Sequence, residues 1–389
     1  MTMLRFMTAG ESHGPCLTAI LEGLPAGLKL DEAAINRDLA RRQGGYGRGG
    51  RMKIEKDKVQ VVSGVRFGRT LGGPVTLQVV NRDYANWGGR MAPFGEPEGP
   101  KVTAARPGHA DLTGVMKYDR EDVRDILERS SARETTMRVA VGAVCKEFLR
   151  ALGITVVSQV LEIGGVKADP AKIDRTKLGG EDTSEVGCLD ADAAAKMREA
   201  IDAAKKKGDT LGGVFEVTVR GVPAGLGTHI QWDRRLDAKI AAAMMSIQAI
   251  KGVEIGAGFL CGSLPGSQIH DEVFLGTDGM PYRKTNRAGG LEGGMSNGEE
   301  IVVRAAMKPI PTLMQPLNSV DVESHEEVSA CKERSDTCAV PAAAVVGEAM
   351  MAFVISEAIC EKFGSDAICD LKRAIRAYEE RIRKGWCER

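Results

Sequence analysis

The chain has 389 residues, which is enough to bury a sizeable core in one large domain or two ordinary ones. Its 43% apolar and 27% charged residues are typical of a globular protein in water. Lysine plus arginine equals aspartate plus glutamate, at 53 each. This balance argues against a nucleic-acid or anionic-membrane binder, whose surface would be basic. We therefore expect neither partner.

The nine cysteines are scattered and form no Cys-x-x-Cys pair. Without metal-ligand spacing or an N-terminal signal peptide, they predict reduced thiols in a cytoplasmic protein and no metal site. The most apolar run covers residues 339–360, and Glu348 and Glu357 interrupt it. We therefore expect a buried helix there and not a membrane span.

The first part of the chain predicts a strand that ends in a turn over 17–27. A helix follows from Asp31 to residue 43, with apolar residues at helical spacing. The glycine-rich loop GGYGRGGRMKIE comes next, and the alternating segments 58–65 and 74–83 predict strands. Residues 84–110 are polar and rich in glycine and proline. A loop of that length in a compact protein is usually functional.

Residues 121–150 have helical character, but Ser131 and Glu134 fit a capping box, which predicts a new helix start at Ser131. Further along the chain the patterns predict strands over 154–163, 212–222 and 299–307, helices over 190–207 and 234–250, and two C-terminal helices.

One short motif occurs twice. LEGLPAGLKL (21–30) and VRGVPAGLGT (219–228) share Gly-x-Pro-Ala-Gly-Leu after a strand and before a helix. The repeat favours two related halves that pack sheet to helix to helix to sheet. The alternative is that a six-residue turn recurred by chance.

Arginines gather in glycine-rich, non-periodic segments and not on the polar faces of helices. They are Arg41, Arg42, Arg48, Arg51, Arg106, Arg129, Arg133 and Arg334. Arginine binds phosphate and carboxylate in a planar, bidentate way, and a helix start adds backbone donors. If these segments converge, the ligand carries several negative charges. Solvated surface arginines are the alternative, and GGYGRGGR also resembles an RGG-type nucleic-acid segment.

Two of the five histidines lie in loops with small neighbours, His13 in GESHG and His109 in RPGHAD. Histidine can give and take protons near neutral pH. Ser12 precedes His13, but adjacent residues rarely have the geometry of a nucleophile and its base, and no Gly-x-Ser-x-Gly elbow is present. No metal-binding spacing, phosphate loop or dinucleotide fingerprint occurs. The residues alone thus predict an enzyme that binds a polyanion and uses two histidines for proton transfer.

Several blocks, in order, resemble the chorismate synthase family. They include GESHGPCLTAILEGLPAG, RRQGGYGRGGRMKIE, RPGHADLTGVMKY, ERSSARETTMRVAVGA, GGMSNGE, MKPIPTLMQPLNSVD and ERSDTCAVPAA. The resemblance runs from about residue 3 to residue 364 and is weaker over 84–105, 165–200 and 263–290. So many separate blocks make it specific.

That resemblance implies the conversion of 5-enolpyruvylshikimate 3-phosphate to chorismate and phosphate, the last step of the shikimate pathway toward aromatic amino acids. The reaction is an anti-1,4-elimination that requires reduced FMN although no net oxidation occurs. The implied fold is α+β, a β-α-β sandwich with central helices between two antiparallel sheets, assembled as a homotetramer. A single domain over 1–389 would carry long active-site loops at about 42–52, 84–110, 263–300 and 309–338.

The resemblance also implies roles for individual residues. His13 protonates the departing phosphate, His109 supports the protonation state of the flavin, and Ser12 with Asp336 relays a proton from it. Substrate anions are held by Arg42, Arg48, Arg51, Arg106, Arg133 and Arg334, and Arg42 and Arg48 also match NADPH positions. FMN positions are Arg129, Ser130, Ser131, Gln248, Ala249, Gly293, Lys308, Pro309, Ile310, Pro311, Thr312 and Arg334.

Two alternatives stay open. One is a flavin- or nucleotide-binding protein that has lost catalysis, against which Ser12, His13, His109 and Asp336 argue. The other is a bifunctional enzyme that also reduces FMN with NADPH. Because the chain contains no obvious inserted reductase domain, we expect the monofunctional form.

Overall fold

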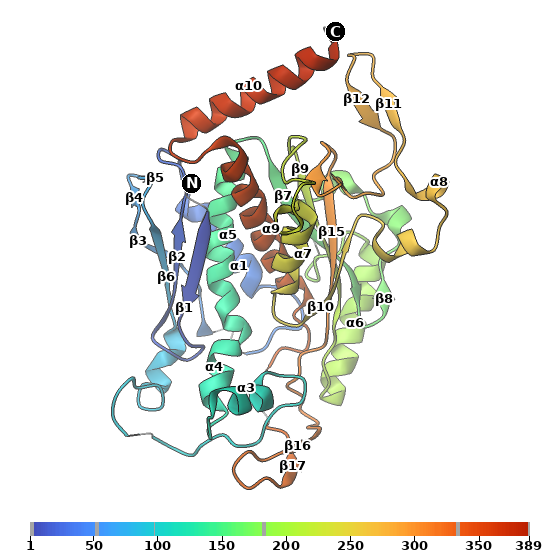
Figure 1. Ribbon diagram of the computed structural model, residues 1–389. Coiled ribbons are helices and arrows are strands. Elements are labelled where there is room, and N and C mark those ends of the chain that lie inside the picture. The colour runs from blue at the N-terminus through green and yellow to red at the C-terminus, as the bar shows by residue number, and fades with distance from the viewer. Residues whose placement is uncertain (1–3, 51–53, 97, 181–183, 332–334, 388–389) are drawn as a thin grey trace.

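The structure is a computed structural model that describes residues 4–50, 54–96, 98–180, 184–331 and 335–387. Two antiparallel sheets form its main body, and helices lie between them (Figure 1). The predicted mixture of helices and antiparallel sheets, of the α+β class, is confirmed.

The N-terminal sheet has the strand order β1-β2-β6-β3. Alternate residues of its central strands are buried, as expected for a sheet with one covered face. On β2 these include Leu17 and Leu21, and on β6 Leu77 and Val79. The strands are β1 (Arg5–Ala9), β2 (Cys16–Glu22), β3 (Gln60–Ser63) and β6 (Val75–Val80).

The second sheet has the order β10-β15-β9-β7-β8. Its strands are β7 (Thr155–Ile163), β8 (Val166–Lys167), β9 (Gly213–Arg220), β10 (Ile250–Ile255) and β15 (Ile301–Met307). Leaving out the short edge strand β8, the strands of each sheet follow the same spatial order when numbered along the chain: first, second, fourth, third.

Helices α5 (Thr135–Arg150) and α9 (Val340–Phe363) form the centre. Helix α5 packs on β2 and β6, α9 packs on β7 and β9, and the two helices pack on each other. Gly142 makes this approach possible, because a Cβ there would lie 2.2 Å from the Cβ of Ala349. Helices α1 (Glu32–Gln43) and α7 (Leu236–Met245) pack beside them.

Helix α9 is long and apolar enough to cross a membrane by composition, but 89% of that stretch is buried inside the protein. The buried helix predicted over 339–360 is therefore confirmed. Glu348 lies in the middle of α9 and pairs with Arg41 at 2.7 Å and Lys146 at 2.7 Å. A buried charge that is paired in this way is compatible with a core helix.

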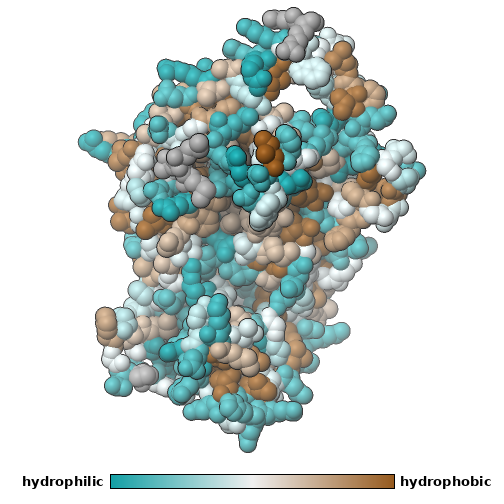
Figure 2. All heavy atoms as spheres, in the orientation of Figure 1, coloured by the Kyte–Doolittle hydropathy of each residue, from teal (hydrophilic) through white to brown (hydrophobic). Residues whose placement is uncertain are grey.

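Smaller elements surround this body. The helices are α3 (Asp111–Tyr118), α4 (Arg124–Ser130), α6 (Ala191–Lys207), α8 (Gly266–Ile269) and α10 (Ile368–Cys387). The hairpin strands are β4 (Val65–Arg66) with β5 (Arg69–Thr70), β11 (Val273–Leu275) with β12 (Pro281–Arg283), β13 (Leu291–Glu292) with β14 (Met295–Ser296), and β16 (Asn318–Val320) with β17 (Glu327–Ser329). Helix α10 and the β11–β12 hairpin extend from one end of the molecule, and α3, α4 and the β16–β17 hairpin lie at the other (Figure 1). Polar and apolar residues intermingle over the viewed face (Figure 2).

Local signals placed several elements well. Asp31 caps α1 by accepting from the amide of Ala33, and α6 covers the predicted segment 190–207. The helix predicted over 234–250 is too long, because α7 ends at Met245 and Ala249 adopts φ +67° before β10 begins. The sequence patterns do not predict strands β1 and β10.

Candidate active site

His13 lies in the tight loop between β1 and β2. Gly10 makes that loop possible, since it has φ +108° and a Cβ there would lie 2.4 Å from the carbonyl oxygen of Cys16. The His13 ring Nδ1 lies 2.8 Å from Oε1 of Glu128, and the His13 amide donates to Oε2 of the same carboxylate at 2.8 Å. The amide of Ser12 donates to the carbonyl oxygen of Glu128. One residue of α4 therefore holds the loop and the ring together.

An aromatic ring covers His13. Trp87, from the long loop after β6, stacks on the imidazole with centroids 4.1 Å apart and planes at 30°. Arg124 lies over the same indole at 4.8 Å and also pairs with Glu128 at 2.9 Å. Burial disfavours the charged form of Glu128, but hydrogen bonds from His13 and Arg124 hold its pKa below the ordinary value. Glu128 is therefore an ionised acceptor for the His13 ring.

His109 has a similar partner. Its Nδ1 lies 2.5 Å from Oδ1 of Asp111, whose side chain is fully buried. Arg106 donates to both carboxylate oxygens of Asp111 and also approaches Nδ1 of His109 at 3.1 Å. Burial opposes ionisation of Asp111, yet hydrogen bonds from His109 and Arg106 lower its pKa well below the usual range. The shorter contact and this charge make Nδ1–H of His109 the donor to Asp111.

Three of the predicted arginines lie close together: Arg42, Arg48 and Arg133. Asp57 accepts from Arg42 at 2.8 Å and from Arg133 at 2.7 Å, and all three side chains are buried. Burial lowers the pKa of Arg42 against the attraction of Asp57, and together with the nearby Arg133 and Arg48 it brings this pKa to about 10. Among the described residues, Nε of Arg42 and Nη2 of Arg133 are buried and have no hydrogen-bond acceptor. The cluster therefore retains donors that an anionic ligand can satisfy.

Asn81 connects this cluster to the His13 loop. Its Oδ1 accepts from Nε of Arg133 at 3.0 Å, while its Nδ2 donates to the carbonyl oxygens of Glu11 and Gly14. Asp336 accepts from Arg48 at 2.6 Å and from the Gly49 amide at 2.6 Å. The structure thus brings Arg42, Arg133 and the His13 loop into one connected network, with Asp336 bound to Arg48.

The helix start at Ser131 is confirmed. The Ser131 side chain accepts from the Arg133 amide, and a single 3-10 turn over Ala132–Glu134 leads into α5. The reciprocal half of the capping box is wrong. The Glu134 carboxylate instead accepts from Thr8, Arg138 and Gln248, because these donors line the adjacent cavity.

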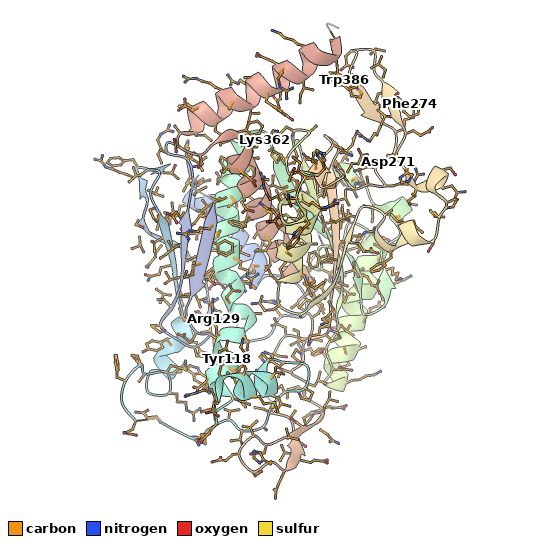
Figure 3. The ribbon with its side chains drawn as sticks, viewed as in Figure 1. Tyr118, Arg129, Asp271, Phe274, Lys362 and Trp386 are labelled. Atoms are coloured by element: carbon orange, nitrogen blue, oxygen red, sulfur yellow. The ribbon has the colours of Figure 1, made fainter. Side chains whose placement is uncertain are left out.

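That cavity has a volume of about 480 Å³ and lies where α4 meets α5, next to β1. Arg129, labelled in Figure 3, lies at this place and donates to the carbonyl and hydroxyl oxygens of Thr8. Gln248 enters from the segment after α7, and its Oε1 is buried without a partner in the described part of the chain. The walls combine polar and apolar side chains: Phe6, Met7, Thr8, Arg129, Glu134, Arg138, Ser246, Gln248 and Met350.

The segment Lys308–Thr312 follows β15 and reaches the His109 loop. The Lys308 ammonium donates to the carbonyl oxygen of Gly108, and the Lys308 amide donates to the carbonyl oxygen of Ala249. Thr312 is buried and its Oγ1 lies 3.4 Å from Nη1 of Arg106. Lys308, Thr312 and Ala249 therefore join the His109 loop to the second sheet. Pro309, Ile310 and Pro311 lie between them in the chain.

Other predicted residues lie elsewhere. Gly293 lies in the β13–β14 hairpin, beside the start of α7, where the neighbouring Gly294 carbonyl accepts from Leu236. Since β15 separates this hairpin from Lys308, the two lie at opposite ends of that strand. Ser130 donates to Ile126 within α4. Arg51 and Arg334 fall outside the described residues, so their predicted roles remain predictions.

The acidic partners of the site's histidines and arginines are not apparent from the sequence. Glu128, Asp111 and Asp57 carry no motif of their own, although Asp111 lies two residues after His109 and Glu128 directly precedes Arg129. The predicted site also omits Trp87 and Asn81. The scarcity of aromatic residues was a usable signal for Trp87, because it is one of only three tryptophans and lies in a loop expected to be functional.

Comparison with known proteins agrees with these features. The family model described as chorismate synthase matches residues 4–360. A chorismate synthase of Syntrophotalea carbinolica is 59% identical over 99% of this chain and 100% of its own, and one of Geobacter metallireducens is 57% identical over 98% and 100%. A solved structure titled "Crystal Structure of Chorismate Synthase" superposes with a TM-score of 0.79, at 45% identity over 98% of this chain and 99% of that one. The chain therefore belongs to the chorismate synthase family.

Proposed function

We propose that this protein is a chorismate synthase that converts 5-enolpyruvylshikimate 3-phosphate to chorismate and phosphate by 1,4-elimination, with reduced FMN bound. The observation that carries the proposal is that Asn81 joins the His13 loop to the buried arginine cluster, in which Arg42 and Arg133 keep donors without a hydrogen bond in the described residues. The second histidine, His109, lies beside another buried arginine, Arg106. Membership of the family supports the proposal independently.

The substrate carries a phosphate and two carboxylates. Arg42 and Arg133 each have a buried donor without a hydrogen bond in the described residues. Asp57 already neutralises both in part, and Glu55 lies 3.6 Å from Nη2 of Arg133. We propose that these arginines, with Arg48 and Arg106, bind the substrate's anionic groups. A desolvated arginine holds such groups tightly because hydrogen bonds to charged groups are short and strong in a low-dielectric site.

His13 and His109 present the same arrangement. In both, Nδ1 is committed to a buried carboxylate, and Nε2 makes no hydrogen bond within the described residues. The C–O bond to phosphate breaks with its electron pair on the departing oxygen, and His13 supplies a proton from Nε2. The ring carbon on the other side of the substrate's ring double bond loses its hydrogen as a proton. The second double bond of the chorismate ring is then complete. We propose that Ser12 and Asp336 help to move that proton away and that His109 holds a proton beside the cofactor.

The residues fit FMN. The 480 Å³ cavity lies within the size range of small-molecule sites. It pairs apolar walls from Phe6 and Met350 with the Arg129 guanidinium and the unpartnered Oε1 of Gln248, which suits a planar polar ring with an anionic tail. We propose that Arg129, Ser130, Ser131, Gln248, Ala249 and the segment Lys308–Thr312 hold it, with Arg334. When bound, reduced FMN supplies electron density that assists the loss of phosphate.

We propose the monofunctional form, in which the reduced flavin comes from elsewhere. The sequence shows no obvious inserted reductase domain, and two chorismate synthases align over their whole length with 98–99% of this chain. The alternative is that Arg42 and Arg48 bind NADPH and the protein reduces FMN itself. Anaerobic oxidation of NADPH by the protein and FMN alone would establish that alternative.

The two halves also support a proposal about architecture. The sheets share one strand order, and the two Gly-x-Pro-Ala-Gly turns share positive φ at Gly23 and Gly27, and at Gly221 and Gly225. We propose a single domain built as a β-α-β sandwich of two pseudo-symmetric halves. A homotetramer in the cytoplasm is the assembly and location that the family resemblance favours.

Product analysis under strict exclusion of oxygen tests the function. Purified protein receives 5-enolpyruvylshikimate 3-phosphate with chemically reduced FMN, with oxidised FMN, or with no flavin. We expect chorismate by chromatography and mass only with reduced FMN. Substrate that stays intact in all three mixtures, although it binds, would contradict the proposal.

A further inference from the structure

Three contacts fix His13, two of them on its ring, and they come from Glu128 and Trp87, to which no part in the reaction has been given. The Glu128 carboxylate binds both the amide and Nδ1 of His13, each at 2.8 Å, while Trp87 stacks on the ring face. The Glu128 side chain is 3% exposed and that of His13 is 13% exposed. A bond in the ring plane and a stack on the ring face together remove both the tilt and the rotation of an imidazole.

The bond to Glu128 also determines which nitrogen carries a proton. An ionised carboxylate accepts only, so Nδ1 must be the donor, and in the neutral ring Nε2 is then the free acceptor. In the protonated ring Nε2–H is the proton available to a ligand. Because Nε2 makes no hydrogen bond within the described residues, the constraint directs all exchange of protons through that atom.

The charges around the ring favour this state. Arg124 pairs with Glu128 at 2.9 Å and lies over the indole of Trp87, so it holds both the carboxylate and the stacking ring. Arg90 lies at 5.9 Å over the same indole. Glu128 thus stays ionised between one arginine and the histidine. Trp87 is also held by cation–π contacts with these two arginines.

We infer that Glu128 and Trp87 are positioning residues that fix His13 with Nδ1 committed and Nε2 presented to the departing phosphate. The inference rests on the proposed function for its chemical consequence, but the state of the ring is measurable without turnover. The comparable pair of His109 and Asp111 shows that the site uses this device twice.

Solid-state NMR of protein labelled with ¹⁵N-histidine reads the tautomer directly, and H13Q identifies the His13 signal among the five histidines. At alkaline pH we expect wild-type His13 to carry its proton on Nδ1. In E128A we expect the signal to change to a mixture rich in the Nε2–H form, which free histidine favours. E128Q keeps an oxygen acceptor in place, so we expect it to restore the Nδ1–H form.

Anaerobic kinetics provide the second readout. For E128A we expect kcat to fall roughly 10- to 100-fold with KM changed little, as when other partners that orient a histidine are removed. E128Q retains an acceptor for Nδ1, so its kcat should fall less than that of E128A. W87F retains an aromatic stack, so its kcat should fall less than that of W87A. The matched control is E121A, since Glu121 lies just before α4 and its side chain is 78% exposed in a pair with Lys101. We expect E121A to match the wild type.

The outcomes separate the two proposals. Wild-type protein without turnover contradicts the proposed function, while the NMR signals still test the positioning of His13. Wild-type turnover with an unchanged His13 tautomer in E128A, or with kcat of E128A within twofold of the wild type, overturns the inference. If E128A does not fold, E128Q and W87A decide it by the same two readouts. There, a kcat of W87A within twofold of the wild type, or a His13 signal of the Nε2–H form in E128Q, would overturn it.

Discussion

Replacing Asp57 with asparagine tests the charge balance of the arginine cluster. Asp57 is the carboxylate that both Arg42 and Arg133 contact, at 2.8 and 2.7 Å, and its side chain is fully buried. Asparagine keeps the shape and one acceptor but leaves two buried guanidinium groups without their shared counter-charge. Breaking a buried ion pair by removing one partner costs about 3–5 kcal/mol. Since the amide retains one acceptor, we expect D57N to lose about 3 kcal/mol of unfolding free energy.

Thermal unfolding measures this loss. The sensitivity of Tm falls with chain length, so for a chain of this size we expect a decrease on the order of 3–6 °C for D57N. The matched control is D370N, which removes an exposed partner of Arg373 and should change the stability by about 0.5 kcal/mol or less. Saturating substrate should reduce the D57N deficit, because a bound polyanion replaces the missing charge and stabilises the folded state. A D57N protein as stable as D370N would refute the reasoning.

Three further predictions concern catalysis, binding and pH. The turnover of H13A should fall roughly 10²–10⁴-fold, which is the usual contribution of a general acid. FMN binding, measured by fluorescence, should stay unchanged, and near-normal rates would contradict the role of His13. R48A should weaken substrate binding roughly 10- to 100-fold in calorimetry, because it leaves part of the substrate's charge unpaired in the site, and an unchanged affinity would exclude that contact. Burial opposes ionisation of Glu348, but Lys146 and Arg41 lower its pKa from 4.5 to about 2. The ionised carboxylate therefore stabilises the fold fully above pH 4.5, and this contribution disappears as the pH falls to 2. E348Q should therefore be less stable than the wild type at pH 7, and the gap in denaturant unfolding should narrow between pH 4.5 and 2; a gap independent of pH would contradict it.

Much of the fold could be predicted from signals between residues that are close in the sequence. Asp31 at the start of α1 and Ser131 before α5 are caps whose effect depends on residues two or three positions away, so the sequence displays them directly. The end of α7 could not be read in this way. It depends on a left-handed residue, Ala249, and on β10 pairing with β15 about fifty residues later.

The candidate active site shows the same difference between local signals and contacts distant in the sequence. The arginines and the two loop histidines could be singled out because their residue types and glycine-rich surroundings are unusual. Their carboxylate partners could not, since Glu128 is 115 residues from His13 and Asp57 is 76 from Arg133. An acidic residue on a helix or after a loop is ordinary until the fold places it against a particular cation. The reciprocal cap expected of Glu134 failed for the same reason, because Thr8 and Gln248 compete for its carboxylate.

The measurement that tests the central claim most directly follows both products in one anaerobic reaction. Protein, 5-enolpyruvylshikimate 3-phosphate and reduced FMN are mixed, and chorismate absorbance and free phosphate are recorded together over time. We predict that the two appear in equal amounts and at equal rates, and that neither appears when the flavin is left oxidised. Phosphate without chorismate, or no phosphate from a protein that binds both FMN and substrate, would contradict the account.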